Sequence, residues 1–154
     1  MKKCFASLFI GLITFDMGIK SHIEDSFKKS DETDTKIPKL VLRRVHNKGF
    51  CLNAFDKYPG IIKSVSAGLC GIIGAYAYPL FKKRGQWGKK LGITILGAGA
   101  FSNTFDRLVR GYVVDYFGIK CKNSKLSKIT ANVADVYILI GSVILTHIHA
   151  KKKK

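Results

Sequence analysis

The sequence predicts an all-α membrane protein: a bundle of four transmembrane helices with a small extracytoplasmic element of strand character between the first two. Hydrophobic residues make up 47% of the 154 residues and gather into long stretches, while Lys and Arg cluster between those stretches. A soluble amphipathic fold would instead intersperse apolar and charged residues at a helical or strand period. We therefore treat residues 1–154 as one integral membrane domain.

Four apolar segments are the expected spans, at residues 4–19, 62–81, 91–107 and 133–150. Residues 64–81 form the clearest span, because 18 residues without a charge nearly cross a bilayer core of about 30 Å. Their glycines, Gly68, Gly71 and Gly74, recur every third residue and predict a face for close helix packing. The first segment resembles a secretory signal but contains Asp16 and lacks a small-x-small cleavage site, which favours a retained helix.

Basic clusters predict the orientation of the bundle. The densest clusters are the start of the chain, residues 82–90 and the C-terminal tail. Four spans place all of them on one side, and the positive-inside rule makes that side the cytoplasm. The N and C termini and the loop at 82–90 are then cytoplasmic, while residues 20–60 and 108–132 lie outside. The segment 20–60 is also basic, which weakens the contrast between the two sides.

The formal net charge of +17 would also suit a nucleic-acid-binding protein. No basic helix face, aromatic stacking platform or zinc-ligand spacing accompanies that charge. Lys and Arg at the ends of apolar segments instead fix topology and contact anionic headgroups. We therefore expect membrane lipids, and no nucleic acid, as partners. The cysteines lack metal-ligand spacing. Cys51 and Cys121 would both lie on the outer side, but the only support for a disulfide between them is that the number of cysteines is even.

Four aspartates stand in or at the ends of apolar segments, where a charged carboxylate costs about 2.5–3.5 kcal/mol on insertion scales. They are Asp16, Asp106, Asp115 and Asp135, and the predicted topology puts all of them toward the outer face. If the third and fourth helices pack together, Asp115 and Asp135 meet. Two such carboxyl groups share a proton, so one can activate water while the other polarises a peptide carbonyl.

Nearby polar residues have the spacing of supporting side chains. Asn103, Asp106 and Arg107 stand at i, i+3 and i+4, so they project from one helical face. Arg107 would give Asp106 a counter-charge and leave donors for a substrate, although an architectural ion pair is equally compatible with the spacing. Asn132 precedes Asp135 by three residues and would also cap the last helix.

The aspartates can also be explained by noncatalytic roles. A single intramembrane aspartate is often a helix–helix hydrogen-bonding group, and we favour that interpretation for Asp16. Spacing alone leaves Asp115 and Asp135 open between catalysis and cation binding.

Local motifs resemble those of the signal peptidase II (lipoprotein signal peptidase) family, most specifically over residues 97–141. The stretch 97–117 is GAGAFSNTFDRLVRGYVVDYF, which is similar to that family's Asn-x-x-Asp-Arg followed by Gly-x-Val-Val-Asp. NVAD at 132–135 is similar to its Asn-x-Ala-Asp. By this resemblance Asp115 and Asp135 correspond to the catalytic aspartates. The residues that shape the site correspond to Asn103, Asp106, Arg107 and Asn132.

Weaker similarities lie upstream. FDMGIK, which contains Asp16, resembles the family's Asp-Gln-x-x-Lys, and VHNKGFCLNAF at 45–55, which contains Asn47, resembles its Asn-x-Gly-Ala-Ala-Phe. The departures indicate a divergent member and leave its substrate range open. They are Met17 for Gln, Phe50 with Cys51 for Ala-Ala, Ser102 for Gly and Ala131 for Phe.

The resemblance implies a monomeric aspartic endopeptidase without metal or cofactor. It would be a multi-pass protein of the bacterial cytoplasmic (inner) membrane, with its active site at the extracytoplasmic face. Its substrates would be the signal peptides of diacylglyceryl-modified prolipoproteins. The alternative is a noncatalytic four-helix membrane protein. That protein would be either a cation-binding channel or transporter subunit, or a degenerate homologue that binds lipidated signal peptides.

Overall fold

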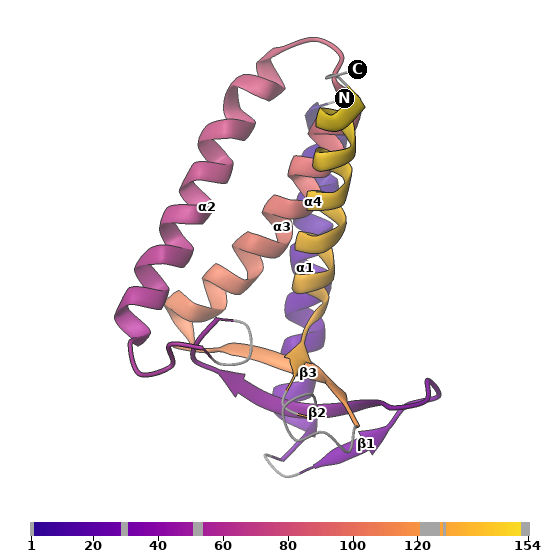
Figure 1. Ribbon diagram of the computed structural model, residues 1–154, viewed down its shortest axis with the longest axis vertical. Helices are drawn as coiled ribbons and strands as arrows, with labels where there is room; N and C mark the ends of the chain where they lie inside the picture. Colours follow the sequence, from indigo (N-terminus) through magenta and orange to yellow (C-terminus); the bar gives the residue numbers. More distant parts are fainter. Residues whose placement is uncertain (1, 29–30, 51–53, 121–126, 128, 152–154) are drawn as a thin grey trace.

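A bundle of long helices stands on a small antiparallel sheet in the computed structural model of the chain (Figure 1). The structure describes residues 2–28, 31–50, 54–120, 127 and 129–151, and both Cys51 and Cys121 lie outside them. The elements are α1 (Lys2–Ser26), β1 (Glu32–Asp34), β2 (Leu40–Asn47), α2 (Pro59–Lys82), α3 (Trp87–Val109), β3 (Val113–Ile119), β4 (Thr130–Ala131) and α4 (Val133–Lys151).

Helices α1, α2 and α4 are long and apolar enough to cross a membrane. α3 is the central helix, because it packs against each of the other three. It also has the most buried residues, twelve against three in α1, three in α2 and two in α4. Its neighbours therefore shield the polar residues of its C-terminal half. The predicted mostly helical architecture is confirmed, and three of the four described helices are candidate membrane spans, α3 not being among them.

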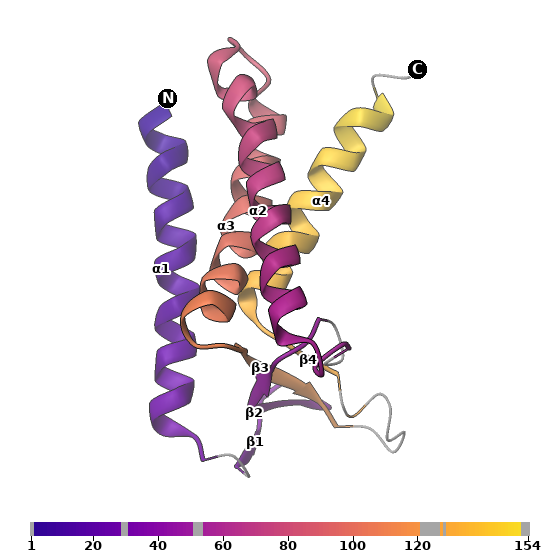
Figure 2. The same ribbon diagram turned by 90° about the vertical axis from the view of Figure 1, so that its left-hand side faces the viewer.

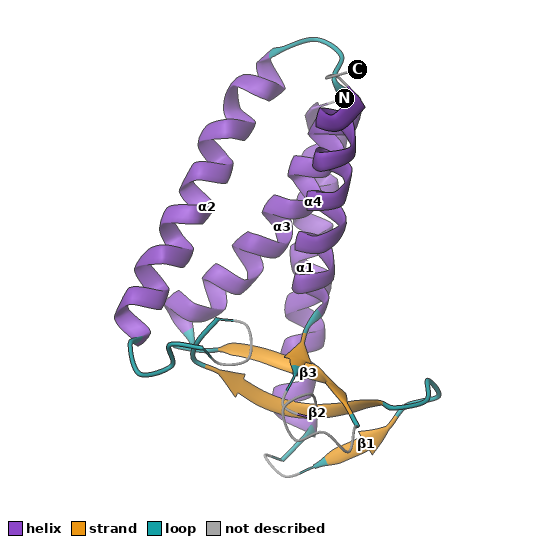
Figure 3. Ribbon diagram, viewed as in Figure 1, coloured by secondary structure: helices purple, strands orange, loops and turns teal. Residues whose placement is uncertain are grey.

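The four strands form one sheet in the order β1-β2-β3-β4 (Figure 3). Strands β1 and β2 come from the segment between the first two helices, where strand character was expected. Strands β3 and β4, however, come from the segment between α3 and α4, so the expectation of a β element from the first segment alone was too narrow. The sheet joins both segments, and Val45 of β2 pairs with Asp115 of β3.

Strand β3 is buried along most of its length. Its residues are mainly β-branched and aromatic, as suits a strand covered on both faces. Val114 and Tyr116 pack with Ile23 from the end of α1, and these three side chains are at most 3% exposed. This small core fixes the sheet against the bundle and holds Asp115 between two buried neighbours.

Glycines allow close contact between α3 and α4. A Cβ added at Gly141 would stand 2.5 Å from the backbone nitrogen of Leu96, and one at Gly99 would collide with the carbonyl oxygen of Ala134. Any larger residue at these positions would push the two backbones apart. The first turn of α4, which carries a candidate carboxylate, is therefore held tightly against α3.

The packing face predicted on α2 is wrong. A Cβ added at Gly68, Gly71 or Gly74 would meet no atom within 4 Å. α2 turns a different face toward α3, where Thr104 donates a hydrogen bond to the carbonyl oxygen of Ser66. The glycine spacing is real, but periodicity alone does not determine which side of a helix meets a neighbour.

The sheet lies at one end of the bundle, and the start of α1, the α2–α3 turn and the end of α4 lie at the other (Figures 1 and 2). Lys2, Lys82 and Lys151 stand in these three places. The three basic clusters singled out above thus lie opposite the sheet, although the sheet itself also carries Arg43 and Arg44, and all four aspartates singled out above lie nearer to the sheet.

Candidate active site

Asp115 is held inside the sheet by uncharged donors. It is the third residue of β3 and is 2% exposed. Among the described residues its hydrogen-bond donors are Asn47 Nδ2 (2.9 Å), Thr130 Oγ1 (3.0 Å) and Asn132 Nδ2 (2.8 Å). Burial raises the pKa of the Asp115 carboxyl above its ordinary value, and these hydrogen bonds oppose that rise in part. The group is thus biased toward holding a proton.

Asp135 lies in the first turn of α4. Asn132 caps this helix: its Oδ1 accepts a hydrogen bond from the backbone nitrogen of Asp135, and its own backbone nitrogen donates to Asp135 Oδ2, both at 3.0 Å. The other carboxylate oxygen accepts a hydrogen bond from Asn103 Nδ2 at 2.8 Å. Asn132 therefore contacts both aspartates, with its amide nitrogen on Asp115 and its oxygen and backbone on Asp135.

Both aspartates line one cleft of about 270 Å³ between the sheet and helices α2, α3 and α4. The polar lining includes Asn47, Asn103 and Arg107, and the apolar lining includes Leu69, Val113 and Ile138. The predicted convergence of the two carboxylates is therefore seen in the fold. Within the described ranges, no group of three or more His, Cys, Asp or Glu side chains is arranged to hold a metal ion.

Arg107 also lines the cleft, but it does not neutralise Asp106, so that prediction is wrong. Its guanidinium donates to the carbonyl oxygens of Gly49 (2.9 Å) and Asn103 (3.4 Å) and lies 5.6 Å from the centre of the Phe50 ring. Arg107 follows Asn103 by four residues and shares its direction, whereas Asp106 turns toward α1. The buried Nε of Arg107 has no hydrogen-bond partner within the described part of the chain.

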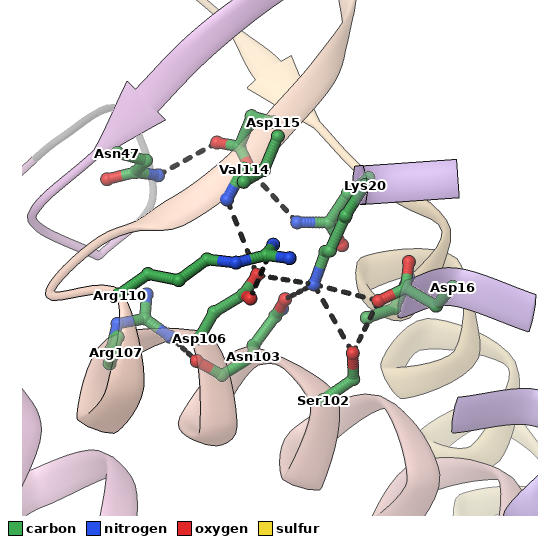
Figure 4. A network of polar contacts seen from close by, with 12 residues as sticks. Asp16, Lys20, Asn47, Ser102, Asn103, Asp106, Arg107, Arg110, Val114 and Asp115 are labelled. Carbon is green, nitrogen blue, oxygen red and sulfur yellow. Dashed lines mark hydrogen bonds and ion pairs between the residues drawn. The ribbon is translucent and has the colours of Figure 1, made fainter. Parts of the chain in front are cut away.

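Asp16 and Asp106 belong to a second, closed cluster around Lys20 (Figure 4). The Lys20 ammonium lies 2.7 Å from Asp16 Oδ2 and 3.0 Å from Asp106 Oδ2, and all three side chains are fully buried. Arg110 adds a second cation to Asp106 at 3.0 Å. None of these four residues lines the cleft. The geometry agrees with the structural interpretation that was favoured for Asp16.

The Lys20 cluster touches the cleft through α3. Lys20 donates a hydrogen bond to Asn103 Oδ1 at 2.9 Å, and the amide nitrogen of the same side chain donates to Asp135. The buried cation therefore fixes which end of the Asn103 amide faces Asp135. Ser102, one of the departures from the family pattern, is fully buried, donates to Asp16 and accepts a hydrogen bond from Lys20.

Backbone contacts attach the cluster to the two elements that carry the cleft aspartates. Asp16 Oδ1 accepts a hydrogen bond from the backbone nitrogen of Ala134 at 3.1 Å, next to Asp135. Asp106 Oδ2 accepts one from the backbone nitrogen of Val114 at 3.4 Å, next to Asp115. The cluster thus holds the backbone next to each cleft aspartate, although none of its own four residues lines the cleft.

The sequence placed Lys20 in the family-like segment FDMGIK but gave it no role in this assembly, and Thr130 was missed altogether. Lys20 had a usable signal, because it follows Asp16 by one helical turn, a spacing that brings opposite charges together. Thr130 had none, because its contact with Asp115 depends on the pairing of Gly118 with Thr130 across β3 and β4.

Comparison with known proteins identifies relatives along most of the chain. The family model for signal peptidase (SPase) II matches residues 8–150. The lipoprotein signal peptidase of Thermodesulfovibrio yellowstonii is 32% identical over 151 residues, covering 95% of this chain and 95% of the relative. That of Lactiplantibacillus plantarum is 28% identical over 137 residues, covering 87% and 90%.

Solved structures of bacterial membrane enzymes share the fold. One superposes with a TM-score of 0.82 over 99% of this chain and 90% of its own, at 21% identity. Another gives a TM-score of 0.75 over 95% and 92%, at 22% identity. These likenesses support the fold, while the family model and the relatives define the lineage. The chain belongs to the signal peptidase II family.

Proposed function

We propose that the chain is an aspartic endopeptidase that removes signal peptides from diacylglyceryl-modified prolipoproteins. Membership of the signal peptidase II family supports the peptidase activity, and relatives named lipoprotein signal peptidase support the substrate class. One observation carries the aspartic mechanism. Asp115 and Asp135 line a common cleft and share Asn132 as a partner, and neither forms an ion pair with a described residue.

Two carboxyl groups in such a cleft titrate as a pair and hold one proton at neutral pH. The ionised member accepts a proton from a water molecule as the water attacks the scissile carbonyl. The protonated member donates its proton to the carbonyl oxygen. Collapse of the tetrahedral intermediate then breaks the C–N bond, and the new amine takes a proton from the pair. Burial raises the pKa of the Asp115 carboxyl, which agrees with a proton being held within the pair.

The cleft also suits the proposed substrate. α2 contributes Leu69 and α4 contributes Ile138 to its walls, so an apolar helix lying beside α3 meets apolar side chains. Arg107 has guanidinium donors in the cleft for a substrate carbonyl. A cation site is disfavoured, because this guanidinium lines the same cleft as the aspartates.

We further propose that four spans cross the bacterial cytoplasmic membrane with the sheet outside and both termini inside. The basic residues opposite the sheet support that orientation. The cleft then lies at the outer interface, where a lipid-bearing cysteine would arrive by lateral diffusion. A monomer suffices, because one chain supplies every residue named above.

Complementation tests the proposal directly. A bacterial strain depleted of its lipoprotein signal peptidase should regain precursor processing with the wild-type chain and not with Asp115→Asn. Asp34→Asn is the matched control, because Asp34 is an exposed strand aspartate outside the cleft, and it should process normally. Equal membrane levels of the three proteins exclude a failure to insert. Processing by Asp115→Asn would end the aspartic mechanism, and altered ion conductance without precursor accumulation would favour the noncatalytic alternative.

A further inference from the structure

We infer that the end of the bundle opposite the sheet carries a binding site for one anionic phospholipid. An acyl chain would lie in an apolar groove between α1, α2 and α3, and the phosphate would lie among basic residues at the α2–α3 turn. The inference depends on the chain being in a membrane and is independent of the catalytic aspartates.

The groove is a cavity of about 760 Å³ between α1, α2 and α3. No described residue lines both the groove and the catalytic cleft. Helices α1, α2 and α3 all contribute apolar side chains to the groove, among them Phe5, Phe9, Ile73, Phe81 and Phe101. A volume of this kind, walled by three helices and by aromatic rings, fits a hydrocarbon chain.

A basic cavity of about 250 Å³ continues the groove toward the end of the bundle and shares Lys2, Phe5 and Phe81 with it. Five described cationic side chains line this cavity: Lys2, Lys82, Lys83, Arg84 and Lys90. The sequence offers no carboxylate to balance them, because no Asp or Glu occurs before Asp16 or between Asp56 and Asp106. The charge of the cavity therefore calls for an anion from outside the chain.

Lys90 gives the strongest sign of a missing partner. It is only 7% exposed, and its ammonium donates a hydrogen bond to the carbonyl oxygen of Lys83 at 2.7 Å. No described carboxylate lies within ion-pairing distance of it. Lys20, the other buried lysine of the bundle, has two carboxylates. A buried ammonium without a counter-ion is costly, and a lipid phosphate would supply one.

The first turn of α3 adds to the same site. Gln86, at its N-cap, makes no side-chain capping hydrogen bond, so backbone N–H groups at this helix start are available to an anion. Trp87 follows and is 51% exposed, as expected for a side chain at a headgroup interface. A second apolar helix would fill the groove but would leave the basic cavity unbalanced. A phospholipid with an anionic headgroup satisfies both cavities.

Lipid retention by the full chain in detergent micelles tests the headgroup site. We expect native mass spectrometry to show tighter retention of dioleoyl phosphatidylglycerol than of dioleoyl phosphatidylcholine. The double variant Lys83→Gln/Arg84→Gln should weaken phosphatidylglycerol retention about tenfold. Lys89→Gln/Lys151→Gln is the matched control, because it removes the same charge outside both cavities. Equal weakening by the two double variants would mean diffuse attraction and would overturn the site.

A second pair of variants tests the acyl groove. Gly74 lines the groove, and a Cβ there meets no atom within 4 Å, so Gly74→Leu should fill the groove without breaking the helix. Gly71 is equally open but lies outside the groove, which makes Gly71→Leu the control. Only Gly74→Leu should lose phosphatidylglycerol. Retention by Gly74→Leu, or displacement of the lipid by inorganic phosphate alone, would overturn the proposal of an acyl-bearing ligand.

Discussion

Two groups of aspartates lie around the C-terminal half of α3, and they differ in one respect above all. Asp16 and Asp106 surround the ammonium of Lys20, have no exposed surface and line no part of the cleft. Asp115 and Asp135 line the cleft, and their hydrogen-bond donors are amide, hydroxyl and backbone groups. The first group is internally neutralised, and the second leaves its charge available to a substrate.

This difference assigns a structural role to the aspartates around Lys20 and a catalytic role to the aspartates of the cleft. A buried carboxylate that has its own cation is paired within the fold and held in one place. A carboxylate surrounded by neutral donors can exchange a proton, because its charge is not fixed by a partner. The contrast predicts that changes in the Lys20 cluster act on stability first, while changes in the cleft act on turnover first.

The largest expected effect is on turnover. Asp135→Asn should lower kcat/KM for a lipidated signal-peptide substrate by about 10²–10⁴-fold, the range that a positioned acid–base group contributes. The thermal midpoint in detergent should stay close to that of the wild type, because Asn keeps the shape of the side chain. A strong loss of stability with residual turnover would reverse the roles assigned to the two groups.

The next effect is on stability. Lys20→Met removes the cation between two buried carboxylates and should lower the free energy of unfolding by about 3–5 kcal/mol, as expected when one member of a buried ion network is removed. A denaturant titration in mixed micelles measures this. Lys120→Met is the matched control, because Lys120 pairs with Asp34 at an exposed site, and it should leave stability unchanged. Equal stability of the two variants would contradict the neutralised-cluster interpretation.

Asn132 belongs to both roles, so its variants can separate them. Asn132→Ser keeps a capping oxygen for the Asp135 backbone but is too short to donate to Asp115. We expect kcat to fall about 10–100-fold through loss of a hydrogen bond to a carboxylate. Asn132→Ala should in addition cost about 0.5–2 kcal/mol of stability through loss of the cap. Matching kinetics for Asn132→Ser and wild type would show that the contact with Asp115 is dispensable.

The smallest effect concerns pH. Because burial raises the pKa of Asp115, the folded chain keeps this proton at pH values where the unfolded chain has released it. Asp115 therefore favours folding most in acid, and this contribution is lost as pH rises from the ordinary carboxyl pKa through the raised one. Between pH 4 and 7 the thermal midpoint should fall more for wild type than for Asp115→Asn, by about 2–4 °C. Parallel pH curves would contradict the raised pKa.

The sequence predicted the parts of this comparison that lie in local patterns. The helices follow from apolar runs, and Asp115 and Asp135 follow from carboxylates at the ends of such runs. The partners of those aspartates were harder to predict. Thr130 reaches Asp115 only through strand pairing, and Asp106 turned to α1 instead of to its neighbour Arg107. The spacing of residues along a helix predicts the direction in which a side chain points. It does not predict which charged residue of the neighbouring element that side chain meets.

The glycines show the same limit. Those of α2 form the more regular pattern, yet Gly99 and Gly141 are the ones at which α3 and α4 approach closely. Close approach depends on which helix faces stand opposite each other, and that is decided by the whole bundle. The sheet was likewise only half expected, because β3 and β4 join β2 across a long separation in sequence.

The tight α3–α4 contact has a mechanical consequence. Both catalytic candidates sit on elements fixed to this helix pair and to the sheet, whereas α2, which walls the cleft with Ser66 and Leu69, has its main helical contact with α3. The cleft thus has one wall, carrying the reacting groups, that is held by two helices and the sheet, and a second wall, α2, that is held mainly by α3. Outward tilting of α2 would widen the opening for an incoming helix while the reacting atoms keep their spacing.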